Sequence, residues 1–157
     1  MNIYESEHKI IVENLEHFNL SDTFECGQYF TFNKIAENDF EIAAFGKCLR
    51  VYQDPKNNKT YFETSPEDFN TIWRKFFDID RDYTKIFAAL RRDEILKKAS
   101  DFCPGIRILR QDPFECLISF IISQNNNIPR IKKIIERLCE NFGEPITMRD
   151  KTYYSFT

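Results

Sequence analysis

The sequence predicts an α+β fold in which an antiparallel sheet comes first and helices follow. Between residues 10 and 63, short segments rich in aromatic and β-branched residues alternate with turn residues. From Ser65 onward, helix-capping residues and apolar residues at helical spacing replace that pattern. The 157 residues, 42% of them hydrophobic and 15% aromatic, suffice for a packed core of one domain, or of one domain and part of another.

Four strands are expected in the first part of the chain. They cover residues 28–32, 40–45, 48–52 and 60–62. Turn-forming residues separate them at positions 36–39, 46–47 and 55–58. Because consecutive strands joined by short turns pair in opposite directions, the sheet should be antiparallel.

Helices are expected after Ser65, which is a good N-cap and is followed by a proline in the first turn. Three stretches then carry apolar residues at helical spacing. They are Phe69, Ile72, Trp73 and Phe76; Tyr83, Ile86, Phe87 and Leu90; and Ile95, Ala99 and Phe102.

Two further helices are predicted near the end of the chain. The first begins at Asp112 and Pro113, and its apolar residues cover most of its circumference, so it should be buried inside a larger domain. The second is amphipathic, has Asn127 as its expected N-cap and stops at Gly143. Its apolar positions are Ile128, Ile131, Ile134, Ile135, Leu138, Cys139 and Phe142.

An amide-rich junction, residues 123–127 (SQNNN), separates these two helices. Four amide side chains are more hydrogen-bonding capacity than a turn needs, and basic residues occupy polar positions of the second helix. These are Arg130, Lys132, Lys133 and Arg137. Amides and helix-start N–H groups beside basic side chains suit phosphates and base edges. On composition alone, an ordinary turn with one capping Asn and a solvated basic face is the simpler interpretation.

Charge and cysteine usage limit the function classes. The net charge of −3 is not typical of a DNA-binding protein, although residues 125–137 hold four basic residues and one acid, Glu136. Five cysteines without a C-x-x-C pair, and no signal peptide, indicate reduced thiols in an intracellular protein. The two histidines lie far from most cysteines, so we expect no metal site and no cofactor. No apolar run approaches the length of a membrane span.

Three segments closely resemble the 8-oxoguanine DNA glycosylases, which belong to the helix-hairpin-helix class of base-excision repair enzymes. They are residues 24–30 (FECGQYF), 105–116 (GIRILRQDPFEC) and 125–130 (NNNIPR). Their order and separation also resemble that family from about residue 10 onward. The resemblance implies a sheet domain like half of a TATA-binding protein, leading into a helical glycosylase domain. It implies duplex DNA containing 8-oxoguanine as the partner, in the cytoplasm or nucleoid, or in a nucleus.

The resemblance also implies roles for individual residues. Asn125 would help to fill the space left by the extruded base, and Arg130 would donate to the O2 and N3 acceptors of the estranged cytosine. Asn126 and Asn127 would contact DNA beside them. The Gly27 carbonyl would accept from N7–H of oxidised guanine and repel the lone pair of normal guanine. Without the resemblance, Gly27 would equally suit an ordinary turn before a strand.

The chain departs from the family in two respects. Thr31 stands where a basic residue is usual, which leaves the charge of this sheet edge in doubt. The family's lysine nucleophile and its assisting aspartate lie beyond a glycine-rich hairpin, and no two of the four glycines here are close enough to form it. We therefore expect no catalytic residue in this chain, which alone should not perform the lyase reaction.

The expected organisation is an N-terminal portion of such a glycosylase. Residues 1–64 would form the sheet, residues 65–104 helices packed on it or linking from it, and residues 105–157 the truncated start of the helical domain. Two alternatives stay open. One is a related glycosylase for alkylated bases, against which the run from Asn125 to Arg130 argues. The other is a noncatalytic module that binds DNA or another protein.

Overall fold

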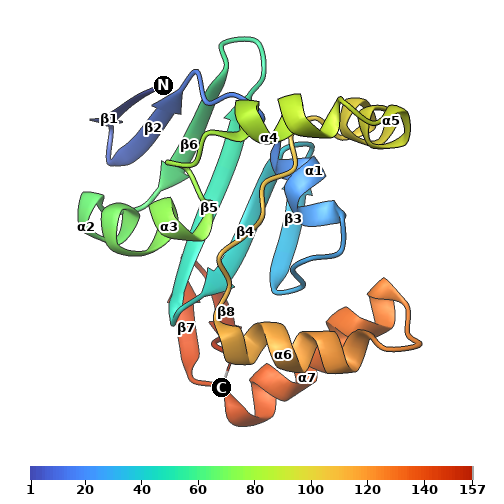
Figure 1. The fold of residues 1–157 in the computed structure, drawn as a ribbon. Helices are drawn as coiled ribbons and strands as arrows, with labels where there is room; N and C mark the ends of the chain where they lie inside the picture. Colours follow the sequence, from blue (N-terminus) through green and yellow to red (C-terminus); the bar gives the residue numbers. More distant parts are fainter. Residues whose placement is uncertain (157) are drawn as a thin grey trace.

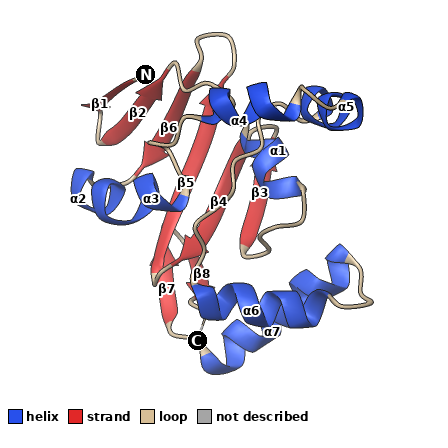
Figure 2. Ribbon diagram, in the orientation of Figure 1, coloured by secondary structure: helices blue, strands red, loops and turns tan. Residues whose placement is uncertain are grey.

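The computed structural model describes residues 1–156 and contains a six-stranded antiparallel sheet with the order β1-β2-β6-β5-β4-β3 (Figures 1 and 2). The strands are β1 (Asn2–Ser6), β2 (Lys9–Glu13), β3 (Phe32–Ala36), β4 (Asp39–Ala44), β5 (Lys47–Asp54) and β6 (Lys59–Glu63). A separate hairpin, β7 (Pro145–Met148) and β8 (Lys151–Tyr154), follows the last helix. The expected α+β class and the antiparallel sheet are confirmed.

The helices cover one face of the sheet and one of its ends. They are α1 (Leu20–Glu25), α2 (Pro66–Asp68), η1 (Phe69–Trp73), α3 (Arg74–Phe76), α4 (Tyr83–Leu90), α5 (Glu94–Phe102), α6 (Pro113–Ser123) and α7 (Ile128–Phe142). In Figure 1, α6 and α7 lie side by side at the lower end of the sheet, and α4 and α5 lie toward the opposite end. Within residues 1–156, no helix is both long enough and apolar enough to cross a lipid bilayer.

The expected capping residues begin these helices. The Ser65 hydroxyl accepts from the Asp68 N–H at 3.1 Å. The Asp112 carboxylate accepts from the N–H groups of Phe114 and Glu115 at 2.9 and 3.1 Å. Each bond satisfies a helix-start N–H that has no partner inside the helix.

The strand predicted over residues 28–32 is wrong. Only Phe32 of this segment belongs to a strand, and residues 28–31 cross from α1 to the edge of the sheet. Tyr29 turns into the core and its hydroxyl donates to the Ala43 carbonyl, while the Gln28 side chain bonds to other loops. The aromatic residues of this segment therefore reflect burial and not strand pairing. Several elements were also missed in the sequence, namely β1, β2, α1, β7 and β8.

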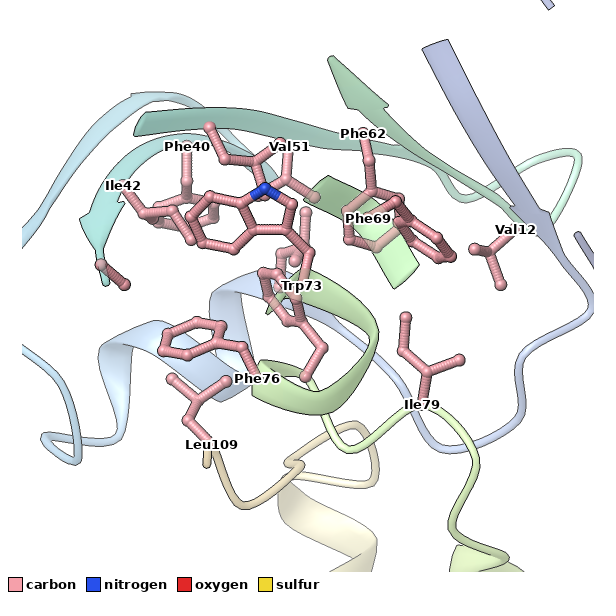
Figure 3. Packing of buried hydrophobic residues seen from close by; sticks show 14 of the residues in the cluster. Val12, Phe40, Ile42, Val51, Phe62, Phe69, Trp73, Phe76, Ile79 and Leu109 are labelled. Carbon is pink, nitrogen blue, oxygen red and sulfur yellow. The ribbon is translucent and has the colours of Figure 1, made fainter. Parts of the chain in front are cut away.

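The core lies between the sheet and the helices α1 to α3. Phe40, Val51 and Phe62 point from adjacent strands, and Trp73 and Phe69 pack against them from η1 (Figure 3). All five side chains are fully buried. Each such side chain stabilises the fold by roughly 2–3 kcal/mol relative to leaving it exposed. This packing holds the sheet edge against which the last two helices lie.

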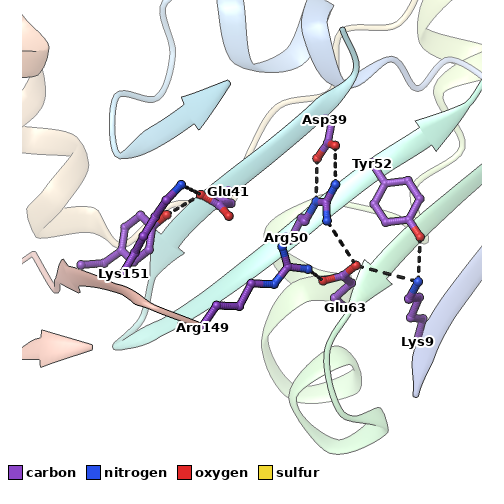
Figure 4. A network of polar contacts seen from close by, with 9 residues as sticks. Lys9, Asp39, Glu41, Arg50, Tyr52, Glu63, Arg149 and Lys151 are labelled. Carbon is purple, nitrogen blue, oxygen red and sulfur yellow. Dashed lines mark hydrogen bonds and ion pairs between the residues drawn. The ribbon is translucent and has the colours of Figure 1, made fainter. Parts of the chain in front are cut away.

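The opposite face of the sheet is polar and carries the β7–β8 hairpin (Figure 4). Glu41, which is 4% exposed, accepts from the Lys151 ammonium at 3.0 Å and from the Tyr153 hydroxyl at 2.5 Å. Burial disfavours the Glu41 carboxylate, but these bonds outweigh it and hold its pKa below the ordinary value. Arg149 also pairs with Glu63 on β6. The hairpin is thereby fixed to the sheet through charge-assisted hydrogen bonds.

The first of the two C-terminal helices is not buried within this chain. The most exposed apolar side chains of α6 are Phe114, Leu117, Phe120 and Ile121, each of them more than half exposed. Its buried residues are Glu115 and Ser119. In α5, Ile95 and Phe102, two of the apolar residues that predicted this helix, are also exposed. The sequence pattern identified both helices, but not which side of each meets the rest of the chain.

Candidate nucleic-acid interface

The structure brings the Gly27 loop against the first residue of α7, which directly follows the amide-rich junction. Gly27 has a φ of +84°, and a Cβ built on it would lie 4.0 Å from Cδ1 of Ile128, the first residue of α7. This left-handed conformation favours glycine. In the described chain, the Gly27 carbonyl has no hydrogen-bond donor among residues 1–156. A free acceptor therefore lies beside the start of the helix that carries Arg130.

The amide side chains of the junction are used in two different ways. Asn126 Nδ2 donates to the Ile122 carbonyl at 3.0 Å, and its Oδ1 accepts from the Asn127 N–H at 3.0 Å. Asn127 Oδ1 accepts from the Arg130 N–H at 3.1 Å, which confirms it as the N-cap of α7. Asn126 and Asn127 thus build the turn itself.

Asn125 and Arg130 remain available to a partner. Asn125 has a φ of +50°, a conformation that asparagine tolerates better than most residues. Both side chains are exposed, and neither makes a hydrogen bond or ion pair with any other residue in the described range 1–156. Gln124 Nε2 donates to the Phe120 carbonyl at 3.2 Å. The side-chain polar groups of residues 124–130 that have no partner within residues 1–156 are therefore those of Asn125 and Arg130, Oε1 of Gln124 and Nδ2 of Asn127.

Gln28 fixes the loop that carries Gly27. Its side-chain Nε2 donates to the carbonyls of Thr23 and Arg107, each at 2.8 Å. Its Oε1 accepts from the Leu109 N–H at 3.0 Å, and its own carbonyl accepts from Gln111 Nε2 at 2.6 Å. One amide therefore joins the end of α1 to the segment that leads into α6.

That segment, residues 103–112, runs along the helical side of the sheet from α5 to α6 (Figure 1). Arg107 anchors it and is 1% exposed. Its guanidinium donates to the carbonyls of Asp78 and Glu16 at 2.7 and 2.8 Å and lies 4.4 Å from the Tyr83 ring centroid. Carbonyl dipoles and an aromatic face stabilise this buried cation without a carboxylate in direct contact.

A buried carboxyl group joins α6 to the residues before β3. Glu115 is 3% exposed, and its Oε1 accepts from the Thr31 hydroxyl at 2.8 Å. Burial raises the pKa of Glu115 to about 7. Thr31, which departs from the family pattern, therefore holds a contact that fixes the sheet edge to the helices.

Lys132 is partly buried and does not lie on the solvated basic face of the simpler interpretation. Its ammonium lies 3.3 Å from the centroid of the Phe32 ring and donates to the Phe32 carbonyl at 3.4 Å. Burial lowers the pKa of Lys132. The exposed basic side chains of α7 are Arg130, Lys133 and Arg137. The positive face of this helix is thus narrower than the sequence suggested.

Gln28, Arg107 and Glu115 belong to the segments that resemble the family, but no role was predicted for any of them from the sequence. Glu115 resembles an ordinary acid in the first turn of a helix, and the sequence carries no sign that this turn faces inward. Gln28 and Arg107 act through loop contacts between distant segments, which no periodic pattern reveals. No group of three or more His, Cys, Asp or Glu residues that could hold a metal ion occurs within residues 1–156.

Comparison with known families gives one profile match. The profile described as "8-oxoguanine DNA glycosylase, N-terminal domain" matches residues 10–117. An N-glycosylase/DNA lyase of Saccharomyces cerevisiae is 45% identical over 85 residues, which are 52% of this chain and 22% of the yeast protein. An N-glycosylase/DNA lyase of Arabidopsis thaliana is 28% identical over 119 residues, which are 73% of this chain and 33% of the plant protein.

A solved structure is similar over nearly the whole chain. The Clostridium acetobutylicum 8-oxoguanine glycosylase/lyase, in complex with double-stranded DNA containing cytosine opposite 8-oxoguanine, superposes with a TM-score of 0.93 at 42% identity. The alignment covers 99% of this chain and 53% of that one. The chain therefore spans about half of the solved relative, and a third or less of the two curated relatives.

Proposed function

Because this chain belongs to the 8-oxoguanine DNA glycosylase family, we propose that it forms the part of a base-excision glycosylase that recognises oxidised guanine opposite cytosine in duplex DNA. The observation that carries the proposal is the meeting of the Gly27 loop with the first residue of α7. It puts the group proposed to read the lesion beside the groups proposed to read its partner base. Duplex DNA containing 8-oxoguanine is the proposed ligand.

Gly27 is the proposed lesion reader. Oxidation of guanine replaces the N7 lone pair by an N–H donor, so a fixed carbonyl oxygen gains a hydrogen bond with the lesion and meets a lone pair in the normal base. Gln28 supports this role because four of its hydrogen bonds fix the loop that carries Gly27. They join it to Thr23 at α1 and to residues 107–111 before α6. A fixed acceptor discriminates better than a mobile one because little order has to be gained on binding.

Arg130 and Asn125 are the proposed readers of the opposite strand. Arg130 brings a multi-donor guanidinium to the O2 and N3 acceptors of an unpaired cytosine, and Asn125 occupies the space that the extruded base leaves. Their side chains have no competing partner within residues 1–156. We also propose DNA contacts for Asn126 and Asn127, in addition to their part in building the turn. At the start of α7, Pro129 has no N–H and the N–H groups of Arg130 and Ile131 donate to Asn127, so the Ile128 N–H is the one first-turn donor without a partner within residues 1–156. This donor favours a nearby phosphate.

We propose that this chain contributes recognition and not the covalent chemistry of the family. The family mechanism needs a lysine nucleophile in a desolvated pocket close to the sugar. None of the three segments that carry the resemblance contains a lysine. In this proposal, three parts of the chain contribute to recognition of the DNA. They are the sheet of residues 1–64, the helices of residues 65–104 and the helical segment from residue 105. The proposed site of action is genomic DNA, in a nucleoid or a nucleus.

A change of the base opposite the lesion tests the role of Arg130. Binding is measured by fluorescence anisotropy on duplexes that carry 8-oxoguanine opposite cytosine or opposite adenine. We expect the chain to prefer cytosine, and Arg130→Ala to reduce that preference about tenfold, since one well-placed bidentate contact contributes about 1–3 kcal/mol of discrimination. Arg137→Ala, on the same helix and also exposed, should keep the preference. An unchanged preference in Arg130→Ala would contradict the assignment.

A further inference from the structure

A cavity of about 480 Å³ lies between the sheet edge, α7 and the β7–β8 hairpin. Phe30 and Phe32 line it from the sheet side, Tyr154 from β8, and Lys132, Glu136 and Cys139 from α7. This volume suits a small organic ligand. The cavity does not include Gly27, Asn125 or Arg130, so the proposed DNA contacts do not account for it.

Lys132 differs from the other basic residues of α7, Arg130, Lys133 and Arg137, in being partly buried. Within residues 1–156, no carboxylate oxygen lies within 4.0 Å of its ammonium, whose one hydrogen bond is the 3.4 Å contact with the Phe32 carbonyl. Glu25, the acid that acts on it most strongly, is already paired with Lys34 at 2.9 Å. Burial lowers the pKa of Lys132 and outweighs the opposing charge of Glu25. A desolvated lysine without an acid partner is the form in which this side chain acts as a nucleophile.

We propose that Lys132 is a covalent binding site for small aldehydes, which enter the cavity and form an imine with its amine. The amine lone pair attacks the carbonyl carbon to give a carbinolamine. Loss of the hydroxyl group as water then leaves a C=N bond, and no oxidant or reductant is consumed. Glu136 lies one helical turn from Lys132 and lines the same cavity, so its carboxyl group is placed to carry the protons of the dehydration step.

The surroundings favour an aldehyde attached to an aromatic ring. Phe30, Phe32 and Tyr154 provide apolar walls, against which a planar ring packs favourably. Cys139 is the competing nucleophile of the cavity, but burial raises the pKa of its thiol to about 11. It therefore stays protonated at neutral pH and reacts slowly. Glu140 and Lys151 also line the cavity, and Lys151 is engaged by Glu41 at 3.0 Å.

Lys133 is a matched control because it is the next residue on the same helix and is exposed. The chain is incubated at pH 7 with benzaldehyde and sodium cyanoborohydride, which reduces an imine to a stable benzylamine. Mass spectrometry of the peptides then compares the rates of benzylation at Lys132 and Lys133. We expect Lys132 to react at least about fivefold faster in the folded chain, with a rate that saturates as benzaldehyde increases. In urea the two rates should become equal.

Two variants keep the assignment testable. Lys133→Arg should keep the fast, saturable labelling, and Lys132→Arg should lose it while the folded chain retains its circular dichroism spectrum. Equal rates at the two lysines of the folded wild-type chain would overturn the proposal, as would a fast phase that survives in Lys132→Arg. Neither outcome bears on DNA recognition, since the residues proposed for that role lie outside the cavity.

Discussion

Gly27 and Ile128 are distant in the sequence but adjacent in the fold, since a Cβ at position 27 would lie 4.0 Å from Cδ1 of Ile128. This contact places a free backbone carbonyl next to the start of α7. The positive φ of Gly27 and the Asn127 cap of α7 are both local features of the sequence. Their juxtaposition is a property of the fold, and the proposed recognition of both strands by one chain depends on it.

Substitution of Gly27 separates backbone strain from recognition. Gly27→Ala should destabilise the fold by about 1–2 kcal/mol, since an L-residue pays that cost in the left-handed region. Gly46→Ala is the control because Gly46 has a φ of +70° and open space around it. Urea denaturation should give similar losses for the two variants. Only Gly27→Ala should weaken the preference for 8-oxoguanine over guanine, and an equal loss of preference in both would contradict the role of Gly27.

Glu115 should make stability depend on pH. Burial raises its pKa to about 7 from an ordinary 4.5, so between these values the folded chain holds a proton that the unfolded chain releases. The contribution is therefore fully present below about pH 4.5, falls as the pH rises to about 7 and is constant above that. Its size is on the order of 3 kcal/mol.

Glu115→Gln should remove this dependence, because the amide oxygen still accepts from Thr31 and does not titrate. The free energy of unfolding is measured in urea at several pH values for both proteins. Between pH 5 and pH 7, the free energy of unfolding should fall in the wild type but not in Glu115→Gln, so the variant becomes more stable relative to the wild type. A constant difference over this range would show that Glu115 does not titrate there.

Even the conservative substitution Arg107→Lys should destabilise the fold. Lysine keeps the charge but cannot reach the Asp78 and Glu16 carbonyls together, and it loses the planar contact with Tyr83. We expect Arg107→Lys to lower the free energy of unfolding by about 2–3 kcal/mol. Arg110→Lys, at an exposed ion pair with Asp78, should cost about 0.5 kcal/mol or less. Equal small effects would mean that the guanidinium geometry is unimportant.

Asn127 can be tested separately as a cap and as a DNA contact. Asn127→Ala should cost about 1 kcal/mol of stability, since the Arg130 N–H loses its acceptor. Asn127→Asp retains an acceptor there and should keep the stability, but its negative charge should weaken DNA binding. Urea denaturation and fluorescence anisotropy give the two readouts. Unchanged DNA affinity in Asn127→Asp would limit this residue to its structural role.

The sequence was most informative where local chemistry decides the structure. Strands β4 to β6, the helix beginning at Ser65 and the caps at Asp112 and Asn127 follow from turn residues, alternation and capping groups. The error at residues 28–32 has a physical reason, because Tyr29 is aromatic to fill the core and not to pair in a sheet.

The contacts that assemble the site were less accessible from sequence. The burial of Glu115 and the docking of Lys132 on Phe32 depend on which helix side faces the sheet. The bonds of Gln28 join loop segments that are distant in the sequence, which no periodic pattern reveals. The apolar pattern of α6 covers so much of its circumference that it could not indicate that side. The division of the amides into turn-building and free members likewise needed the backbone geometry around Asn125 and Asn126.

The most direct test of DNA recognition is the affinity of the wild-type chain for two duplexes that differ only in the oxidation of one guanine. Fluorescence anisotropy compares a duplex containing 8-oxoguanine opposite cytosine with the same duplex containing guanine. We expect the lesion duplex to bind about tenfold more tightly, which corresponds to about 1.4 kcal/mol. This is the magnitude of one hydrogen bond from N7–H of the lesion to the Gly27 carbonyl, compared with the repulsion between that carbonyl and the N7 lone pair of guanine. Equal affinities in a chain with an intact circular dichroism spectrum would contradict lesion recognition by this part of the protein.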